Sequence, residues 1–304
     1  HDGARIAPLA GQRWLASGAQ AVELHPLFHF QPGLLTFCLG AAGCSARCTF
    51  CQNWELALAV RQHGLPPGGA PAVDELLGQA TARGCGAISF TYSEATVWPE
   101  GIEAVAARAR AMGLRVILVT NGFIAPPTLA GLLPLIDAVK IDLKGASESQ
   151  CQSLAGISLG PVIESLRRLR AAGVWLELST VLVPGILDSR AAVEGCAELI
   201  REHCGTDTPW HLQRFFPAHR LVHEQPGDLG RLLEARRWAL DAGLNYVYVS
   251  NISGIAERNT HCAGCGRLLI DRRRTPSGRV LSTCPDCHAS LPGRWDAAQT
   301  QGGD

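Results

Sequence analysis

Short apolar runs alternate with longer amphipathic stretches through the middle of the chain. Several runs are nearly continuous and rich in β-branched residues (VILVT, AVKIDL, YVYV), as expected for parallel strands covered on both faces. This pattern predicts strands at residues 34–39, 87–92, 114–120, 138–143, 174–181, 211–216 and 244–249. It predicts helices between them at residues 73–83, 99–112, 127–133, 161–172, 190–203 and 228–242.

Proline and glycine mark the ends of these helices. Prolines suit the first turns and glycines suit the C-terminal caps, at Pro99, Pro127 and Pro161 and at Gly84, Gly113, Gly173 and Gly243. Six or more such units predict a parallel barrel or a doubly wound sheet. Polar residues cluster just after the strands, where α/β folds bind ligands, and no G-x-G-x-x-G follows the first strand. We therefore expect an α/β fold, a partial (β/α)6-type TIM barrel.

The hydrophobic pattern and the composition change along the chain and divide it into four parts. Residues 34–255 carry the strand–helix pattern, and residues 256–295 form a compact cysteine-rich segment. Residues 296–304 are polar and glycine-rich, which predicts a disordered tail. Residues 1–33 read as an N-terminal extension. The chain starts at His1 and its only methionine is Met112, so we expect this extension to be truncated.

Composition narrows the functional classes. Hydrophobic residues make up 47% and charged residues 18%, with 27 basic and 27 acidic side chains, so nothing indicates a nucleic-acid binder. No apolar run approaches the roughly 18–20 residues of a membrane span, and no secretory signal is visible. A cytoplasmic location is expected. Seven of the twelve cysteines fall into two sets with metal-ligand spacing, which favours metal coordination over disulfides.

The first cysteine set reads Cys44-x3-Cys48-x2-Cys51 and directly follows the first predicted strand. Thiolates suit iron–sulfur clusters, and ordinary 4Fe–4S electron carriers use four of them. Three cysteines would leave one iron free to bind a small molecule. The alternative is a structural zinc site completed by Cys38 or His63.

The same segment resembles the radical S-adenosylmethionine superfamily, whose signature is C-x3-C-x-Φ-C with an aromatic residue at Φ. Phe50 stands at that position. The resemblance implies a 4Fe–4S cluster on the catalytic residues Cys44, Cys48 and Cys51, with S-adenosylmethionine chelating the open iron through its amine and carboxylate. Reductive cleavage then gives a 5′-deoxyadenosyl radical that removes hydrogen from a substrate. Phe50 would pack near the adenine.

Three further post-strand segments extend the resemblance. Tyr92-Ser93-Glu94 stands where many members have Gly-Gly-Glu and hold the methionyl amine. Thr120-Asn121-Gly122 and Asp142-Leu143-Lys144 resemble turns of pyruvate formate-lyase activating enzyme that face S-adenosylmethionine. The residues implied to bind the cosubstrate are Phe50, Tyr92, Glu94, Thr120, Asn121, Asp142 and Lys144, together with His211 and Arg214 from the sixth predicted strand.

A narrower resemblance links the chain to the AmmeMemoRadiSam-system radical enzymes. It rests on segments such as Cys51-Gln52-Asn53-Trp54-Glu55, Arg214-Phe215-Phe216-Pro217 and Tyr248-Val249-Ser250-Asn251. It implies Memo-like and AMMECR-like partner proteins, and the chemistry implies an electron donor such as flavodoxin or ferredoxin. The substrate stays open between a protein glycine and a small metabolite. A rival hypothesis is a non-catalytic, metal-stapled binding or scaffold protein.

The second cysteine set has the spacing of a zinc ribbon, with Cys262-x2-Cys265 and Cys284-x2-Cys287 eighteen residues apart. Four thiolates complete a tetrahedral structural zinc site; a rubredoxin-like iron or an auxiliary iron–sulfur cluster is the alternative. Arg272, Arg273 and Arg274 offer either a basic docking surface or a solvated hairpin tip. We expect the remaining cysteines to be buried as small apolar residues, namely Cys38, Cys85, Cys151, Cys196 and Cys204.

Overall fold

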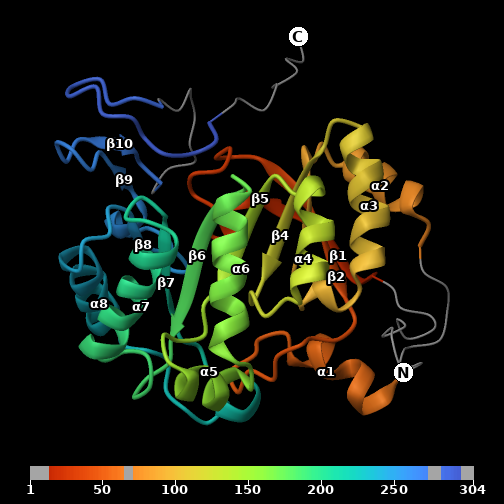
Figure 1. Ribbon diagram of the computed structural model, residues 1–304, viewed down its shortest axis with the longest axis horizontal. Helices are drawn as coiled ribbons and strands as arrows, with labels where there is room; N and C mark the ends of the chain where they lie inside the picture. The colour runs from red at the N-terminus through yellow and green to blue at the C-terminus, as the bar shows by residue number, and fades with distance from the viewer. Residues whose placement is uncertain (1–13, 65–70, 273–281, 296–304) are drawn as a thin grey trace.

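The computed structural model describes residues 14–64, 71–272 and 282–295. One eight-stranded sheet runs in the order β1-β2-β3-β4-β5-β6-β7-β8 and curves into an open barrel (Figure 1). Strand β1 is antiparallel to β2, and every later pair is parallel. The strands are β1 (Trp14–Ala21), β2 (Leu35–Ala41), β3 (Ala87–Phe90), β4 (Arg115–Thr120), β5 (Ala138–Asp142), β6 (Trp175–Leu182), β7 (Trp210–Arg214) and β8 (Val247–Val249).

Helices cover the outer face of the sheet, as the sequence pattern predicts. Each of the six predicted helices is present within two residues at either end. The helices are α1 (Trp54–His63), α2 (Val73–Ala82), α3 (Pro99–Ala111), α4 (Pro126–Leu132), α5 (Glu148–Ala155), α6 (Leu159–Ala171), α7 (Arg190–His203) and α8 (Leu229–Asp241). The α/β class and the partial barrel are therefore confirmed, with seven parallel strands. None of these helices, in the part of the chain that the structure describes, is long and apolar enough to cross a membrane.

The amino-terminal end of the barrel is closed by residues 22–34, which we call the plug. Its apolar side chains Val22, Leu27, Phe30 and Leu34 pack inside the barrel against residues of β3, β4 and β5. The plug is a closed loop, because Val22 N donates to Leu34 O at 2.9 Å. The barrel is thus filled from one end and open at the other.

A buried carboxylate fastens the plug to the barrel wall. Glu177 on β6 is fully buried and accepts hydrogen bonds from Phe28 N at 2.9 Å, His29 N at 2.8 Å, Trp175 Nε1 at 3.0 Å and His211 Nε2 at 2.8 Å. Burial raises the pKa of Glu177, but the hydrogen bond and charge of His211 outweigh it and hold the pKa below its usual value. An ionised, fully hydrogen-bonded carboxylate is the form that such a site favours.

Two plug histidines make stability sensitive to acid. Burial, aided by Lys140, lowers the pKa of His25 to about 3, and burial, against the opposing effect of Glu177, lowers that of His29 to about 4. Unfolding lets each ring take up a proton near pH 6.5. Stability is therefore complete above that pH and is lost as pH falls toward 4. Between pH 7 and pH 5 we expect each histidine to remove about 2 kcal/mol from the unfolding free energy.

Urea denaturation at the two pH values measures this effect. The His29→Gln variant should lose about 2 kcal/mol of the wild-type pH dependence, because the buried His25 and His211, whose pKa values are also lowered by burial, keep their own contributions. The variant of the exposed His261, His261→Gln, should keep all of the pH dependence. Equal unfolding free energies of the wild-type protein at pH 7 and pH 5 would contradict buried, neutral histidines.

The C-terminal cysteine-rich part, described for residues 256–272 and 282–295, is called the four-cysteine module. It contains the short antiparallel strands β9 (Thr260–His261) and β10 (Leu268–Ile270). Figure 1 shows β9 and β10 near the amino-terminal ends of the barrel strands, on the side opposite α1 and α5. A small apolar cluster joins the module to the plug and to β8, formed by Phe28, Tyr246, Tyr248, Ile270 and Leu291.

Candidate active site

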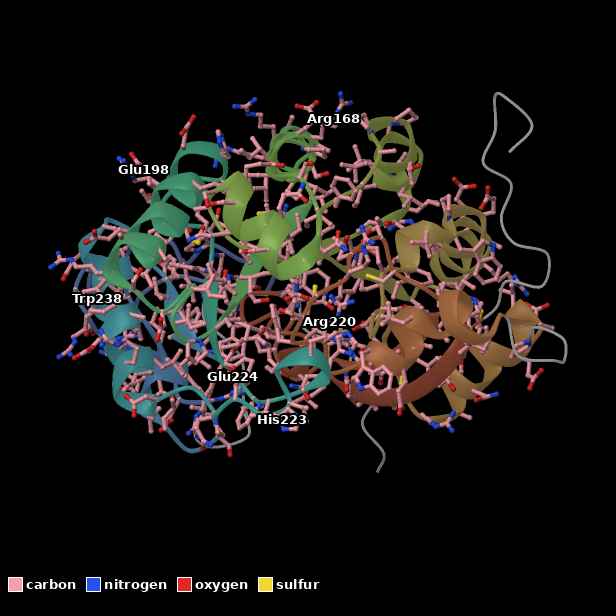
Figure 2. All side chains as sticks on the ribbon, turned by 90° about the horizontal axis from the view of Figure 1, so that it is seen from below. Arg168, Glu198, Arg220, His223, Glu224 and Trp238 are labelled. Atoms are coloured by element: carbon pink, nitrogen blue, oxygen red, sulfur yellow. The ribbon has the colours of Figure 1, made fainter. Side chains whose placement is uncertain are left out.

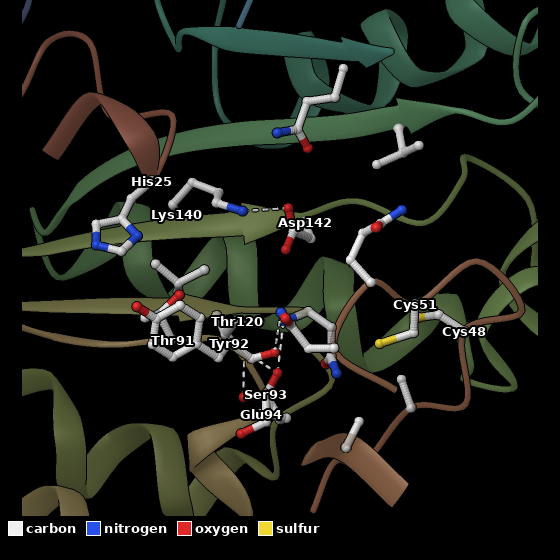
Figure 3. Close-up of a pocket in the computed structure, with 18 of the residues that line it drawn as sticks. His25, Cys48, Cys51, Thr91, Tyr92, Ser93, Glu94, Thr120, Lys140 and Asp142 are labelled. Atoms are coloured by element: carbon white, nitrogen blue, oxygen red, sulfur yellow. Dashed lines mark hydrogen bonds and ion pairs between the residues drawn. The ribbon is translucent and has the colours of Figure 1, made fainter. Parts of the chain in front are cut away.

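A pocket of about 460 Å³ lies inside the open end of the barrel. Its walls come from the carboxyl ends of the strands and its closed end from the plug (Figure 3). The three cysteines of the first set line this pocket together with Phe50. Of the other predicted cosubstrate residues, the structure places Tyr92, Glu94, Thr120, Asn121, Asp142, Lys144 and Arg214 in its lining, but not His211.

The cysteine loop between β2 and α1 is held in place by its neighbours. Arg47 N donates to Ala155 O at 2.7 Å, and Thr49 N donates to Leu154 O at 2.9 Å, so α5 supports the loop from one side. Arg220 N donates to Thr49 O at 3.0 Å from the segment after β7. Figure 2 shows that segment, which carries Arg220, His223 and Glu224, beside the α1 region at this end of the molecule.

The donor set around the loop is three thiols. Among the described residues lining the pocket, Cys44, Cys48 and Cys51 are the only cysteines. Histidine is represented there by His25, at the opposite end from Cys48 and Cys51 (Figure 3). His219 lines a small adjoining cavity with the three cysteines, but no described group of three donors within 4.8 Å includes it. The three thiols also do not converge on a single-ion site, since the only described group with all donor atoms within 4.8 Å is the second cysteine set. Thiols that are not all within 4.8 Å of one another fit a cluster with several irons better than one zinc ion.

The proposed fourth zinc ligands do not complete this set. Cys38 is fully buried inside the barrel, with its Sγ 3.4 Å from His25 Nε2 and 3.6 Å from Thr36 Oγ1, and it does not line the pocket. The side chain of His63 lies outside the described residues. All five cysteines outside the two sets are buried, as the sequence predicts.

Glu94 organises the turn after β4. Its carboxylate is buried and accepts from Thr120 Oγ1 at 2.8 Å, from Asn121 N at 2.7 Å and from Thr96 Oγ1 at 2.7 Å (Figure 3). Burial raises the pKa of Glu94, and these hydrogen bonds oppose the rise. The acid thus fixes the Thr120–Asn121 backbone as well as lining the pocket.

Asn121 links that turn to the cysteine loop. Its Nδ2 lies 3.1 Å from Ser45 Oγ and 3.9 Å from Cys44 Sγ, and its Oδ1 accepts from Phe123 N at 2.8 Å. The amide is therefore oriented from both ends. Any group held by the thiols meets a fixed Asn121 side chain.

Three charged side chains line the pocket at the carboxyl end of strand β5. Lys140 and Asp142 share one face of the strand because strand side chains alternate, and Lys144 follows in the loop two residues after the strand ends. Lys140 Nζ and Ser179 Oγ both contact an Asp142 carboxylate oxygen, and Lys144 Nζ lies 3.9 Å from the other. Burial raises the pKa of Asp142, but the two lysines outweigh it and hold the pKa well below its usual range. Lys144 Nζ also lies 5.7 Å from the centre of the Phe50 ring.

Lys140 was not among the predicted site residues. It lines the pocket and is buried, yet in the sequence it stands in the middle of an apolar run. The spacing of Lys140 and Asp142 is the signal that would have found it, since a period of two puts both on one face of the strand.

Tyr92 adopts a conformation that normally favours glycine, with φ of 66°. This left-handed backbone is uncommon for a bulky residue and would suit glycine better. Asn53 Nδ2 donates to Tyr92 O at 2.8 Å and ties it to the start of α1.

His211 and Arg214 occupy opposite ends of β7. His211 is the second residue of the strand, is fully buried and donates to Glu177, so it belongs to the plug attachment. Arg214 ends the strand and lines the pocket; its Nε donates to Gly227 O at 2.6 Å. The placement of His211 in the pocket is corrected: only the last residues of the strand reach it.

The second cysteine set forms a compact group. The Sγ atoms of Cys262, Cys265, Cys284 and Cys287 lie within 4.8 Å of one another, as a tetrahedral metal site requires. Nearby, Arg272 is buried and donates to Thr260 Oγ1 at 2.6 Å and to Phe28 O. The expectation that Arg272 offers a basic surface or a solvated hairpin tip is therefore wrong. Arg273 and Arg274 lie outside the described residues.

Comparisons with known proteins identify the family of the chain. The family described as the radical SAM superfamily matches residues 40–194. An uncharacterized protein of Methanocaldococcus jannaschii, MJ0808, is 33% identical over 255 residues, which cover 83% of this chain and 74% of that protein. The isethionate sulfite-lyase activating enzyme of Nitratidesulfovibrio vulgaris is 27% identical over 163 residues, covering 53% of this chain and 51% of the enzyme. The chain thus matches about half the length of that activating enzyme.

Solved structures share the fold. A radical SAM methyltransferase from Sphaerobacter thermophilus superposes with a TM-score of 0.54 at 21% identity, covering 79% of this chain and 71% of that one. Streptococcus suis SuiB bound to its precursor peptide SuiA gives a TM-score of 0.55 at 15% identity, covering 74% of this chain and 50% of that one. These likenesses concern the architecture of the barrel.

Proposed function

Because the chain belongs to the radical S-adenosylmethionine superfamily, we propose that it is an enzyme that holds a 4Fe–4S cluster on Cys44, Cys48 and Cys51. The observation that carries the proposal is the donor set, three thiols and no fourth cysteine among the described residues lining one pocket. The cluster supplies the electron that cleaves S-adenosylmethionine and so yields a hydrogen-abstracting radical.

The remaining pocket residues bind and orient the cosubstrate. Phe50 offers an apolar ring for the adenine, and Lys144, close to that ring, offers a cation for the methionyl carboxylate. Asp142 is ionised by its two lysine neighbours and suits a ribose hydroxyl or the ordering of Lys144. Glu94 supports the methionyl amine site by fixing the Thr120–Asn121 turn.

The substrate is proposed to be a residue of another protein. Two relatives found by sequence are named activating enzymes, for isethionate sulfite-lyase and for benzylsuccinate synthase. The wall opposite the plug adds polar side chains from Gln213, Arg214 and Asn251, which suit a polypeptide loop with exposed amides. A small polar metabolite is the alternative that the same wall accommodates.

Partners follow from the chemistry and from the narrower resemblance. A flavodoxin or ferredoxin is proposed as the electron donor, and Memo-like and AMMECR-like proteins as associated partners. Pull-down of purified Memo-like and AMMECR-like proteins with the tagged chain tests the second part; failure of both to bind at micromolar concentrations counts against it.

Anaerobic reconstitution with iron and sulfide tests the proposed activity. The expected result is about four irons per chain beyond the metal of the module, a visible iron–sulfur chromophore, and 5′-deoxyadenosine formed when S-adenosylmethionine and a low-potential reductant are added. The scaffold hypothesis predicts neither chromophore nor product. An intact cluster that produces no 5′-deoxyadenosine would overturn the enzyme proposal.

A further inference from the structure

The backbone of the four-cysteine module is hydrogen-bonded to the backbone of the plug. Arg294 N donates to His29 O at 2.7 Å, and Gln31 N donates to Arg294 O at 2.7 Å, forming a bridge between the two segments. Arg272 donates to Phe28 O, and its guanidinium carbon lies 4.5 Å from the centre of the Phe28 ring. Segments some 240 residues apart in the sequence are thus joined at the closed end of the barrel.

A directional chain of hydrogen bonds runs through the same contact. His29 Nδ1 lies 2.6 Å from Pro292 O, so it carries the proton because a carbonyl only accepts. His29 Nε2 must then accept from the Tyr248 hydroxyl at 2.6 Å, and this hydroxyl accepts from Thr260 Oγ1 at 3.0 Å. Thr260 Oγ1 in turn accepts from Arg272 Nη1 at 2.6 Å. The chain leaves the module at Arg272, crosses β8 and the plug, and returns to the module at Pro292.

The module has little else to keep it folded. Its described strands have two and three residues, and few of its side chains enter the shared apolar cluster. Segments of this size usually depend on a metal or disulfides. Its four thiols are grouped as a metal requires, with Cys262 Sγ 3.5 Å from Cys287 Sγ and Cys265 Sγ 3.6 Å from Cys284 Sγ. Metal binding in such modules is coupled to folding.

The plug in turn forms the closed end of the pocket. Gln20, which precedes it, and Leu24, His25 and Pro26 within it line the pocket. Gln31 has a φ of 42°, a left-handed conformation that a non-glycine residue keeps only when its surroundings hold it. The hydrogen bond from Gln31 to Arg294 is one such restraint, so release of the module frees this part of the plug to relax.

We propose that a metal ion bound by the four-cysteine module fixes the floor of the active-site pocket by clamping the plug through Arg272, Pro292 and Arg294. The module is then an internal clamp, positioned at the end of the barrel opposite the cysteine loop. Its metal would shape the closed end of the pocket, which Leu24, His25 and Pro26 line, while the Cys44 set would hold the reacting cluster. The clamp fixes the conformation of the plug whether or not S-adenosylmethionine is cleaved.

Hydrogen exchange and thiol labelling test the clamp on the full-length zinc-loaded protein. In Cys287→Ser, or after zinc is removed by a chelator, we expect amide exchange in residues 22–34 to accelerate by roughly tenfold or more, while exchange in β4 stays unchanged. Cys38, which contacts His25, should be alkylated faster by a similar factor, and Cys204 should not. The native metal is identified by elemental analysis of the purified protein.

Arginine variants test the clamp with zinc still bound, so they remain informative even if the metal-free protein unfolds. Arg272→Lys retains the charge but loses the paired donors to Thr260 and Phe28, so it should accelerate exchange in the plug with zinc still bound. The matched control Arg267→Lys alters an exposed arginine of the same module that pairs with Asp286 and should behave as wild type. If amide exchange in residues 22–34 were as slow in Arg272→Lys and in the metal-free protein as in the wild-type zinc-loaded protein, the clamp would be overturned. Equal acceleration of β4 would overturn it as well, because that outcome means global unfolding.

Discussion

Replacing Cys48 with alanine is expected to remove the iron–sulfur chromophore and to lower 5′-deoxyadenosine formation at least roughly 1,000-fold. Cys44, Cys48 and Cys51 are the only cysteines among the described residues that line the pocket, so loss of one would leave the cluster with two. The anaerobically reconstituted variant is measured by its visible absorbance, its iron content and the yield of 5′-deoxyadenosine.

The matched control is Cys204→Ala, which changes a buried cysteine outside both sets. It should cost only the modest stability of a small core truncation and retain cluster and product. A Cys48→Ala protein that keeps a full chromophore and normal turnover would show that the loop does not hold the cluster.

Asp142→Asn is expected to destabilise the protein by about 3 kcal/mol, because it leaves the buried Lys140 ammonium without its anion. It should also weaken S-adenosylmethionine binding by roughly tenfold or more, since Lys144 loses the carboxylate that lies 3.9 Å away. Guanidinium denaturation gives the stability, and isothermal titration to the reconstituted protein gives the affinity.

A double-mutant cycle separates these effects. Lys140→Met together with Asp142→Asn removes both charges and should recover much of the lost stability but not the cosubstrate affinity. Asp74→Asn is the control, since its ion pair with Arg108 is exposed and such pairs contribute about 0–1 kcal/mol. If the single and double variants were equally stable, Lys140 and Asp142 would not be the coupled buried pair described here.

Much of the barrel could be predicted from the sequence because parallel strands are apolar on both faces. The runs that became β4 and β5 stand out for this reason, and the prolines and glycines mark the helices between. Strand β1 was not predicted, since Trp14–Ala21 is rich in small residues and lacks clear alternation. Its partner in the sheet, β2, lies fourteen or more residues away, a pairing that local pattern does not reveal.

The candidate site was predictable where motif spacing and strand ends coincide. The Cys44 loop, Glu94 and Asn121 follow strands and Asp142 ends one, and the pocket brings them together. Lys140 was missed because it lies within a strand. His211 was misplaced because it was grouped with Arg214, three residues further along, although it lies near the start of β7 and contacts Glu177 at the plug.

Contacts between distant segments account for the remaining differences between the sequence-based prediction and the structure. Glu177, His29 and Tyr248 each look like isolated polar residues in the sequence, and their hydrogen bonds form only where the barrel, the plug and the four-cysteine module meet. Arg272 likewise reads as part of a basic run, but it is buried against Phe28. Sequence pattern reports which face of an element is apolar; it does not report which distant segment will cover it.

Electron–nuclear double resonance of the reduced cluster with 15N-labelled S-adenosylmethionine tests the central claim most directly. Three protein thiolates leave one iron open, so the account predicts a hyperfine coupling between the cluster and the methionyl nitrogen. An intact cluster that shows no such coupling, with a fourth protein ligand on that iron, would contradict it.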